Sequence, residues 1–319
     1  MYESNQALSV YQSFKYAKII CNNFFPYRMI LGVSPMFICF YSNGFPRMVL
    51  PLYKKSFKNI YYMFGYKTGC AYLNPIYFSD ITISEIADYM RTLKQILGSG
   101  KLLITYIQET SIFFQYITTQ FRHYMLTDCV AINFEDGYDT YLNSLSKNVR
   151  QNIRTAYNRL KRNNLSIKLD VRSEASLTKL EFKHVYDIYI GRMGKRYNKK
   201  TTFIHKAFIK NFDIGSRAIN ELNSDVSWYL LYINDELAGF YNAFLSRDRL
   251  EIIVPRLAIA EGYEWYSPGL LLLNESIRYL IENSAVKSID LIHGLEKYKL
   301  DMGGQKKMCC KIVLDLEGI

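Results

Sequence analysis

Several titratable side chains near the end of the chain are of types that could move protons. Glu251 falls in one predicted strand, and Asp290 and His293 fall in another. Positioned carboxylates and imidazoles act as general acids or bases, so these three residues are candidates for taking a proton from an amine. Each type is also common as a hydrogen-bonded core group or an exposed side chain. No Ser/His/Asp arrangement is readable, which disfavours covalent catalysis.

The run Ser267-Pro268-Gly269 is the second candidate site, because it predicts the start of a helix. Ser267 can cap the free N–H groups, and Pro268 suits the first helical position. Gly269 lets another molecule approach the backbone closely. A helix N-terminus attracts anions, but the dipole alone contributes only about 0.3–1 kcal/mol at an exposed site. Phosphate binding would therefore need direct N–H bonds and nearby cations, and the run could equally begin an ordinary core helix.

Residues 138–163 are predicted to form one long helix that is rich in cations. Arg150 and Arg154 share a face at a spacing of four residues, and Lys147 lies just before them. Arginine offers bidentate geometry, so this face could hold the phosphates of a donor or an acceptor. It could equally be a solvated basic face. Aromatic residues are too few along it to favour nucleic acid.

A short basic stretch, residues 191–200, is predicted as a loop between helices at residues 176–193 and 204–222. It contains two glycines but lacks the Lys-Ser/Thr ending of a P-loop, which excludes that motif. The loop is interpreted as a solvated connection, with an acceptor-facing role as the alternative.

Two groups of alternating elements precede and surround these motifs. The first group contains a hairpin, a strand, a helix and a strand, at residues 36–52, 60–64, 83–97 and 102–107. The second contains three meander strands, the helix that begins at Ser267 and two further strands, at residues 228–233, 237–245, 250–255, 289–293 and 308–316. This order favours a mixed α/β fold.

Composition limits the class of protein without selecting a partner. The 319 residues are 49% hydrophobic, which is enough for a sizeable core, and the formal net charge of +11 favours anionic partners. The six cysteines show no paired metal spacing and are typical of reduced residues in a cytoplasmic protein. The polar and acidic first six residues predict no signal peptide, and the apolar runs are shorter than the roughly 20 residues of a membrane span.

The two C-terminal motifs resemble those of GNAT-superfamily acetyltransferases found with cellulose and exopolysaccharide biosynthesis. The motifs are Ser267-Pro268-Gly269-x-Leu271-Leu272 and Asp290-x-x-x-Gly294-x-Glu296-x-Tyr298-Lys299. Residues 145–154 are similar to a basic helix of that family, and the resemblance covers about residues 131–316. It extends distantly to the peptidoglycan bridge-forming aminoacyltransferases. The usual GNAT phosphate loop is absent in its common form, so the donor stays open between acetyl-CoA, a longer acyl-CoA and an aminoacyl-tRNA.

The resemblance implies an α/β (α+β) fold with a GNAT-like mixed sheet flanked by helices. The implied domains are a degenerate GNAT-like unit at residues 1–127, with a structural or acceptor-shaping role, and an acyltransferase domain at residues 128–319. Strands at residues 250–258 and 289–293 would splay apart and admit the acyl-CoA, whose pyrophosphate would meet the next helix. Tyr298 would protonate the leaving thiolate, and such a donor contributes about 10²–10⁴-fold.

The residue roles follow from these motifs together. Lys299 is expected to pair with a phosphate or with Glu296. The expected catalytic residues are Tyr298, Glu251, Asp290 and His293; the cofactor-binding residues are Ser267, Pro268, Gly269, Leu270, Leu271 and Lys299; and the substrate-binding residues are Lys147, Arg150 and Arg154.

The sequence therefore predicts a cytoplasmic, CoA-dependent N-acyltransferase with acetyl-CoA or another acyl-CoA as co-substrate and no metal. The acceptor would be an amine on a sugar nucleotide, a glycan precursor or a related metabolite in polysaccharide biosynthesis. One alternative is an aminoacyl-tRNA-dependent transferase, which would bind tRNA. Another is an inactive GNAT-fold protein that binds an anionic glycan or nucleic acid through the helix with Lys147 and Arg162. Without a transmembrane segment, peripheral membrane contact stays open.

Overall fold

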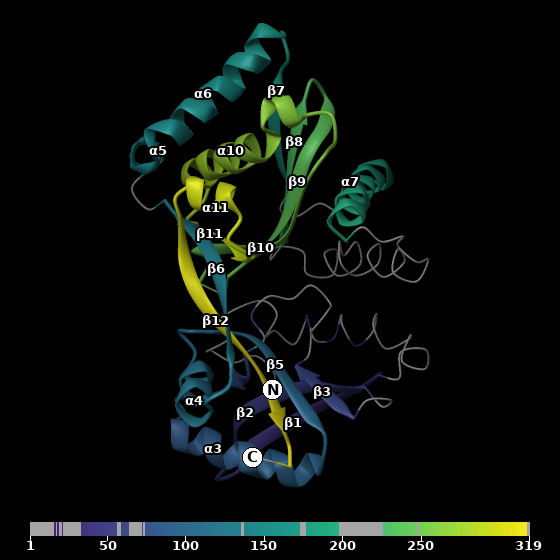
Figure 1. Cartoon of the computed structure of the whole chain (residues 1–319), viewed down its shortest axis with the longest axis vertical. Coiled ribbons are helices and arrows are strands. Elements are labelled where there is room, and N and C mark those ends of the chain that lie inside the picture. Colours follow the sequence, from purple (N-terminus) through teal and green to yellow (C-terminus); the bar gives the residue numbers. More distant parts are fainter. Residues whose placement is uncertain are drawn as a thin grey trace. The chain divides into compact units, whose positions relative to one another are not determined.

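Two units of the chain, each with its own part of the sheet, make up the fold in the computed structural model (Figure 1). The structure describes residues 33–55, 59–63, 74–134, 137–172, 177–197, 226–246 and 248–317, with the single residues 16, 18, 21 and 72. Unit 1 comprises Met1–Cys129 and Lys307–Ile319, and unit 2 comprises Val130–Lys306. The first boundary between the two units, after Cys129, lies next to the division expected between residues 127 and 128. The return of the C-terminal segment to unit 1 was not expected.

In unit 1 the strand order is β1-β2-β3-β5-β12, with β4 paired to β2. The strands are β1 (Val33–Ser42), β2 (Phe45–Lys55), β3 (Ile60–Met63), β4 (Ile76–Tyr77), β5 (Lys101–Gln108) and β12 (Gly304–Asp315). The predicted hairpin is present, since β1 and β2 pair antiparallel. Asn43 and Gly44 form its turn with positive φ angles of 52° and 80°. The pair β3 and β5 is parallel.

Helices α3 (Ile83–Leu97) and α4 (Ile112–Gln120) complete the described part of unit 1. The bounds of α3 agree with the predicted helix because its end signals are local. Thr82 and Glu85 form a reciprocal capping box at the start, and the N–H of Gly98 bonds the carbonyl of Lys94 at the end. The buried face of α3 consists of Ile86, Met90, Leu93 and Leu97.

In unit 2 the strand order is β6-β11-β10-β9-β8-β7. The strands are β6 (Met125–Asn133), β7 (Ile167–Arg172), β8 (Val226–Ile233), β9 (Glu236–Leu245), β10 (Glu251–Ile259) and β11 (Ser288–His293). β8, β9 and β10 form the predicted antiparallel meander, and β10 pairs with β11 in parallel. A parallel pair needs a crossover, and α10 supplies it between these two strands.

The helices of unit 2 lie on both sides of its sheet (Figure 1). They are α5 (Tyr138–Ser144), α6 (Lys147–Arg162), α7 (Lys179–Tyr197), the short 3₁₀ helix η6 (Glu264–Tyr266), α10 (Pro268–Asn283) and α11 (Lys297–Asp301). α5, α6 and α10 share one hydrophobic core with the sheet, which includes Leu160, Leu231 and Ile277. α7 lies across the sheet from α10 and packs against β10 and β9. None of the described helices is both long and apolar enough to cross a membrane.

Two predicted elements differ from the structure. The helix expected at residues 138–163 is broken, because Leu145 is extended with ψ of 151° and the Ser146 hydroxyl caps α6 by accepting from the Val149 N–H. The loop expected at residues 191–200 is helical up to Tyr197, as a continuation of α7. Residues 198–200 and the helix expected at 204–222 lie outside the described residues.

Candidate active site

The parallel strands β10 and β11 pair over a short stretch and then separate. The paired residues are Glu251 with Ser288, Ile252 with Ile289 and Ile253 with Asp290. Beyond this point β10 stays paired with β9, after a register irregularity between Ile253 and Arg256. A sheet that opens in this way leaves the edges of both strands facing a gap, and the pockets described next begin there.

Two pockets lie along the unpaired part of β10. The first, the β11 pocket, has a cavity volume of about 90 Å³ and is lined by residues from β10, β11, α11 and α7, which include Arg256, His293 and Glu296. The second, the α10 pocket, has a cavity volume of about 370 Å³ and reaches Gly269 and Leu270 at the start of α10. Its volume is the right order for part of a small-molecule ligand.

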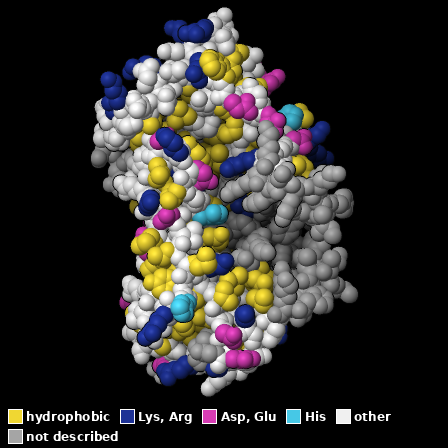
Figure 2. All heavy atoms as spheres, viewed as in Figure 1, with side chains coloured by type: hydrophobic (Ala, Val, Ile, Leu, Met, Phe, Trp, Pro, Cys, Tyr) yellow, Lys and Arg dark blue, Asp and Glu magenta, His cyan; other side chains and the backbone are white. Residues whose placement is uncertain are grey.

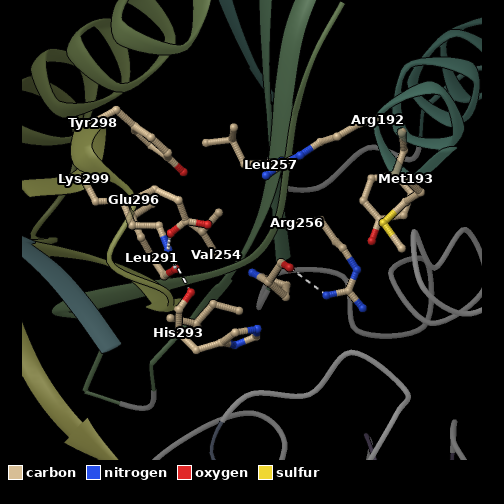
Figure 3. A pocket seen from close by; sticks show the side chains of 13 residues that line it. Arg192, Met193, Val254, Arg256, Leu257, Leu291, His293, Glu296, Tyr298 and Lys299 are labelled. Atoms are coloured by element: carbon tan, nitrogen blue, oxygen red, sulfur yellow. Dashed lines mark hydrogen bonds and ion pairs between the residues drawn. The ribbon is translucent and has the colours of Figure 1, made fainter. Parts of the chain in front are cut away.

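The two pockets adjoin, because Arg192, Leu257 and Tyr298 line both of them. Figure 3 shows the Tyr298 hydroxyl directed into the β11 pocket, while Arg192 reaches in from α7 on the opposite side of Leu257. A ligand lying from the start of α10 to His293 would therefore pass between Tyr298 and Arg192. Such a path suits a long ligand whose reactive end meets the β11 pocket.

The start of α10 differs from the expected capped N-terminus. Ser267 adopts a left-handed conformation with φ of 53°, and its side chain makes no capping hydrogen bond. Its backbone carbonyl instead accepts from the N–H groups of Leu270 and Leu271, at 3.0 and 3.1 Å. Pro268 has no N–H, so Gly269 has the only N–H of this first turn without a hydrogen bond among the described residues. The expected set of free amides therefore reduces to Gly269, and Leu271 is fully buried.

The turn before α10 is held from α6. Arg159 donates to the Trp265 carbonyl at 2.7 Å and its guanidinium lies 3.9 Å from the centre of the Trp265 ring. Asn163 donates to the Tyr266 hydroxyl at 2.7 Å. Two carboxylates, Glu261 and Glu264, also line the α10 pocket, and Glu264 accepts from the Gly262 N–H at 2.9 Å. This end of the pocket thus combines one free amide with acidic neighbours.

A polar network on the other side of α10 fixes the helix to α5 and α6. Asn274 donates to the Tyr157 hydroxyl and accepts from the Tyr138 hydroxyl, both at 3.0 Å. The Tyr157 hydroxyl donates to Glu275. Burial, and then this carboxylate, raise the pKa of Tyr157 above the ordinary range of a phenol, so the hydroxyl stays protonated as a donor. The network is structural, because these residues line neither pocket.

Lys299 is buried and braces the turn after β11, rather than reaching toward the start of α10. Its ammonium donates to the carbonyls of Leu291 and His293 at 2.9 Å and of Gly294 at 3.3 Å. It also lies 2.9 Å from a carboxylate oxygen of Glu296, the expected protein partner. With all these partners the ammonium has no position left for a phosphate. Its role here is to hold the β11–α11 turn, which carries Tyr298.

Two of the expected catalytic carboxylates lie away from the pockets. Glu251 is at the closed end of the strand pair, where it accepts from the Ser288 hydroxyl at 3.0 Å. Asp290 is fully buried and accepts from the Ile292 N–H at 2.7 Å. Neither residue lines a pocket. The structure therefore brings together Tyr298, His293, Gly269 and Leu270, and leaves these two carboxylates outside the group.

The cations expected to bind substrate lie on α6 and line neither pocket. Arg150 donates to the carbonyls of Asn143 and Leu145, at 3.0 and 2.6 Å, and so closes the break between α5 and α6. Arg154 is exposed and donates to the Gln151 side chain at 3.4 Å, and Lys147 is exposed. The site geometry thus gives these residues no contact with the pockets.

Two arginines of the site were not anticipated. Arg256 on β10 is 9% exposed and donates to the Pro255 carbonyl at 2.7 Å, and Arg192 projects from α7. Arg192 belongs to the basic stretch that was interpreted as a solvated loop, so a signal for it was present in the sequence. Among the described residues, no group of three or more metal-ligand side chains is assembled.

Comparisons with known proteins agree with this geometry. Residues 147–300 match the family model described as "Acetyltransferase (GNAT) domain". FemX aligns with a TM-score of 0.58 at 9% identity, over 94% of this chain and 91% of that chain. The tandem GNAT protein from the clavulanic acid biosynthesis pathway aligns with a TM-score of 0.53 at 8% identity, over 95% and 94%. L-PGS from Bacillus licheniformis aligns with a TM-score of 0.53 at 12% identity, over 91% and 90%. No curated protein sequence matches the chain.

At these identities the structural likenesses establish the fold, and the family match adds the class. The predicted mixed α/β fold of GNAT type is confirmed. The match over residues 147–300 is to a GNAT acetyltransferase domain, and the chain is an acyltransferase by class.

Proposed function

We propose that this chain is a CoA-dependent N-acyltransferase that moves an acetyl group from acetyl-CoA directly to an amine. The observation that carries the proposal is the gap between β10 and β11, which continues as two adjoining pockets from His293 to the start of α10. In this assignment the diphosphate of the donor lies at the Gly269 amide, and the thioester lies beside Tyr298. The acceptor amine enters at the β11 pocket.

The transfer step needs an attacking amine, an acyl carbon and a protonated leaving group. The amine nitrogen attacks the thioester carbonyl, the C–N bond forms and the C–S bond breaks. Tyr298 donates its hydroxyl proton to the departing thiolate, and the nitrogen loses a proton to His293 or to water. Support for Tyr298 is its hydroxyl, which is directed into the β11 pocket (Figure 3). Of the other three expected catalytic residues, His293 lines the same pocket.

Thiol release is the experiment that tests this function. Purified protein is mixed with acetyl-CoA and a panel of amino sugars and amino-sugar nucleotides, and free CoA is measured. We expect release with at least one amine, and Tyr298→Phe should lower kcat by about 10²–10⁴-fold. Tyr279→Phe is the matched control, because Tyr279 is exposed on α10 and lines neither pocket. An absence of acetyl-CoA binding and of release with every amine would overturn the proposal.

The acceptor class and setting belong to the same proposal. An amine on a sugar nucleotide, a lipid-linked sugar or another glycan precursor agrees with the resemblance to acetyltransferases of exopolysaccharide biosynthesis. We also propose a cytoplasmic location, in keeping with the scattered cysteines, none of which forms a disulfide within the described residues. Unit 1 is proposed to be a degenerate GNAT-like copy with a structural role.

An aminoacyl-tRNA-dependent transferase is the second candidate, and the surface of α6 favours it. α6 carries six Lys and Arg residues and no acid, as its sequence KNVRQNIRTAYNRLKR shows. Dark blue side chains follow the edge of unit 2 where Figure 1 draws α6 (Figure 2). A basic surface of this kind binds nucleic acid with strong salt dependence. Salt-sensitive binding of an aminoacyl-tRNA, together with no affinity for acetyl-CoA, would favour this candidate over the first.

A further inference from the structure

The β11 pocket has a wall that is rich in cations and has one acid. The cations Arg192, Arg256 and Lys299 line it beside His293, and Glu296 is its only carboxylate among the described lining residues. That carboxylate lies 2.9 Å from the Lys299 ammonium, which offsets its charge. The guanidinium groups of Arg192 and Arg256 add positive charge to the same wall, so the pocket favours an anion.

Arg192 is the cation of this wall that is available to a ligand. No hydrogen bond or ion pair engages its guanidinium within the part of the chain that the structure describes, although the group is only partly exposed. Figure 3 shows it extended from α7 into the space beside Leu257, toward the side from which Tyr298 points. A guanidinium that enters a cavity without a protein partner presents a planar pair of donors that fits a phosphate or carboxylate bidentately.

The position of Arg192 relative to the reacting groups sets what it can bind. Arg192, Leu257 and Tyr298 all line both pockets, so Arg192 lies where the donor channel meets the acceptor side. α7, which carries it, is anchored at its other end, because Arg172 on β7 donates to Glu181 at 2.8 Å. α7 also packs against β10, so the fold sets where the arginine lies relative to the pocket, which is what discrimination between acceptors requires.

We propose, resting on the acyltransferase function above, that the acceptor is an amine bearing a phosphate or carboxylate, and that Arg192 binds this anionic group in the β11 pocket. Arg192 is then a specificity-determining residue. It orients the acceptor so that its amine faces the thioester beside Tyr298. An uncharged amine of the same size leaves the guanidinium without its partner and binds less firmly.

Matched acceptor pairs test the proposal in the thiol-release assay. Glucosamine 6-phosphate is compared with glucosamine, and alanine with alaninamide, so that each pair differs by one anionic group. We expect kcat/KM to favour the anionic member of at least one pair by about 10–100-fold, the value of a charge-assisted hydrogen bond. A preference in the first pair alone shows that the pocket recognises a phosphate. A preference in the second pair alone shows that it recognises a carboxylate.

Variants of Arg192 separate its role from general charge effects. Arg192→Met should reduce the preference to about onefold, and Arg192→Lys should keep part of it, because lysine retains the charge but not the paired donors. Lys183→Met is the control, since Lys183 is an exposed cation on the same helix that lines neither pocket. Equal preference in wild type and Arg192→Met would overturn the proposal, as would a loss of acetyl-CoA affinity in Arg192→Met without loss of acceptor preference.

A binding measurement keeps this inference distinct from the acyltransferase function. Calorimetric titration with glucosamine 6-phosphate and with alanine requires no turnover. Binding by wild type that is lost in Arg192→Met and kept in Lys183→Met would support the anion site even if no amine released CoA. Failure of wild type to bind either anionic amine more tightly than its uncharged partner would overturn the inference, whatever the result for acetyl-CoA.

Discussion

Each unit contains a strand, a helix and a second strand whose two strands pair in parallel. In unit 1 these are β3, α3 and β5, with Ile60 opposite Lys101 at the start of the pairing. In unit 2 they are β10, α10 and β11, with Glu251 opposite Ser288. The same local architecture thus occurs twice, and the two copies differ at the start of the helix.

The start of α3 is closed by its own side chains. The Thr82 N–H and hydroxyl donate to Glu85 at 2.9 and 3.0 Å, and Arg47 adds an ion pair at 2.8 Å. An anion approaching these amides would meet a carboxylate that already occupies the position. α10 has no side-chain cap and no acid in its first turn, and Gly269 faces a pocket. A helix N-terminus becomes a ligand site only when the protein leaves its donors unused.

The segments that follow the second strand of each copy, β5 and β11, also differ. After β5, the Ser111 hydroxyl caps α4 by accepting from the Phe113 N–H at 3.2 Å. After β11, the buried Lys299 ammonium donates hydrogen bonds to the carbonyls of Leu291 and His293. The first device only starts a helix, whereas the second fixes the turn that presents Tyr298 to the pocket.

The largest effect is expected from filling the open helix start. Gly269→Trp should weaken acetyl-CoA binding by at least about 100-fold, or ~2.7 kcal/mol, because the indole occupies the α10 pocket. Ser84→Trp, at the matching second position of α3, should leave the affinity unchanged. Gly269→Ala should keep its affinity for acetyl-CoA, since an added Cβ lies at an ordinary 3.7 Å from the Ile259 side chain. Calorimetry measures all three, and equal losses in the Gly269 and Ser84 tryptophan variants would remove the distinction between the units.

Loss of the buried ammonium should have the next largest effect. Lys299→Met leaves the carbonyls after β11 without their donor and should lower the free energy of unfolding by about 2 kcal/mol. Lys297→Met is the control, because Lys297 is 86% exposed in its pair with Asp301 and should cost less than about 0.5 kcal/mol. Urea denaturation gives both values. Similar values for the two variants would contradict the structural role of Lys299.

Alanine at the two helix starts should separate a capped from an uncapped N-terminus. Thr82→Ala removes the acceptor for the Glu85 N–H and should lower the free energy of unfolding by about 1 kcal/mol. Ser267→Ala should change it by less than about 0.3 kcal/mol, because the Ser267 hydroxyl makes no cap. The same denaturation series measures both, and a larger loss for Ser267→Ala than for Thr82→Ala would reverse the comparison.

The smallest effect is a pH dependence at α3. Hydrogen bonds from the Thr82 backbone, and then from Arg47, hold the pKa of Glu85 below its usual range. A lowered folded pKa means that the contribution is fully present above the unfolded pKa and is lost as pH falls through the folded pKa. The stability difference between wild type and Glu85→Gln should be under about 1 kcal/mol at pH 7 and should shrink below about pH 4. A difference that grew on acidification would contradict the closed helix start.

The parts of the fold that could be predicted from sequence are those with local signals. The Asn43-Gly44 turn defines its hairpin, and Thr82 with Glu85 and Gly98 bound α3 at both ends. The break at Leu145 was missed because this apolar residue continues the helical spacing of its neighbours, although Ser146 was readable as a cap. Sequence periodicity does not report a single extended residue between two helices.

The parts of the site that were missed depend on contacts between distant segments. Gly269 and Tyr298 were placed by the motifs, and both line the α10 pocket. Burial of Lys299 was not readable, because its partners are backbone carbonyls that any sequence supplies. Arg192 lies on a helix that precedes the meander, and only the packing of α7 on β10 brings it to the pocket.

A crystal structure soaked with CoA tests the central claim most directly. The account predicts density for the diphosphate at the Gly269 amide, with the thiol between β10 and α11 within reach of the Tyr298 hydroxyl. CoA bound at the start of α3, or a gap between β10 and β11 that stays empty at saturating CoA, would contradict it.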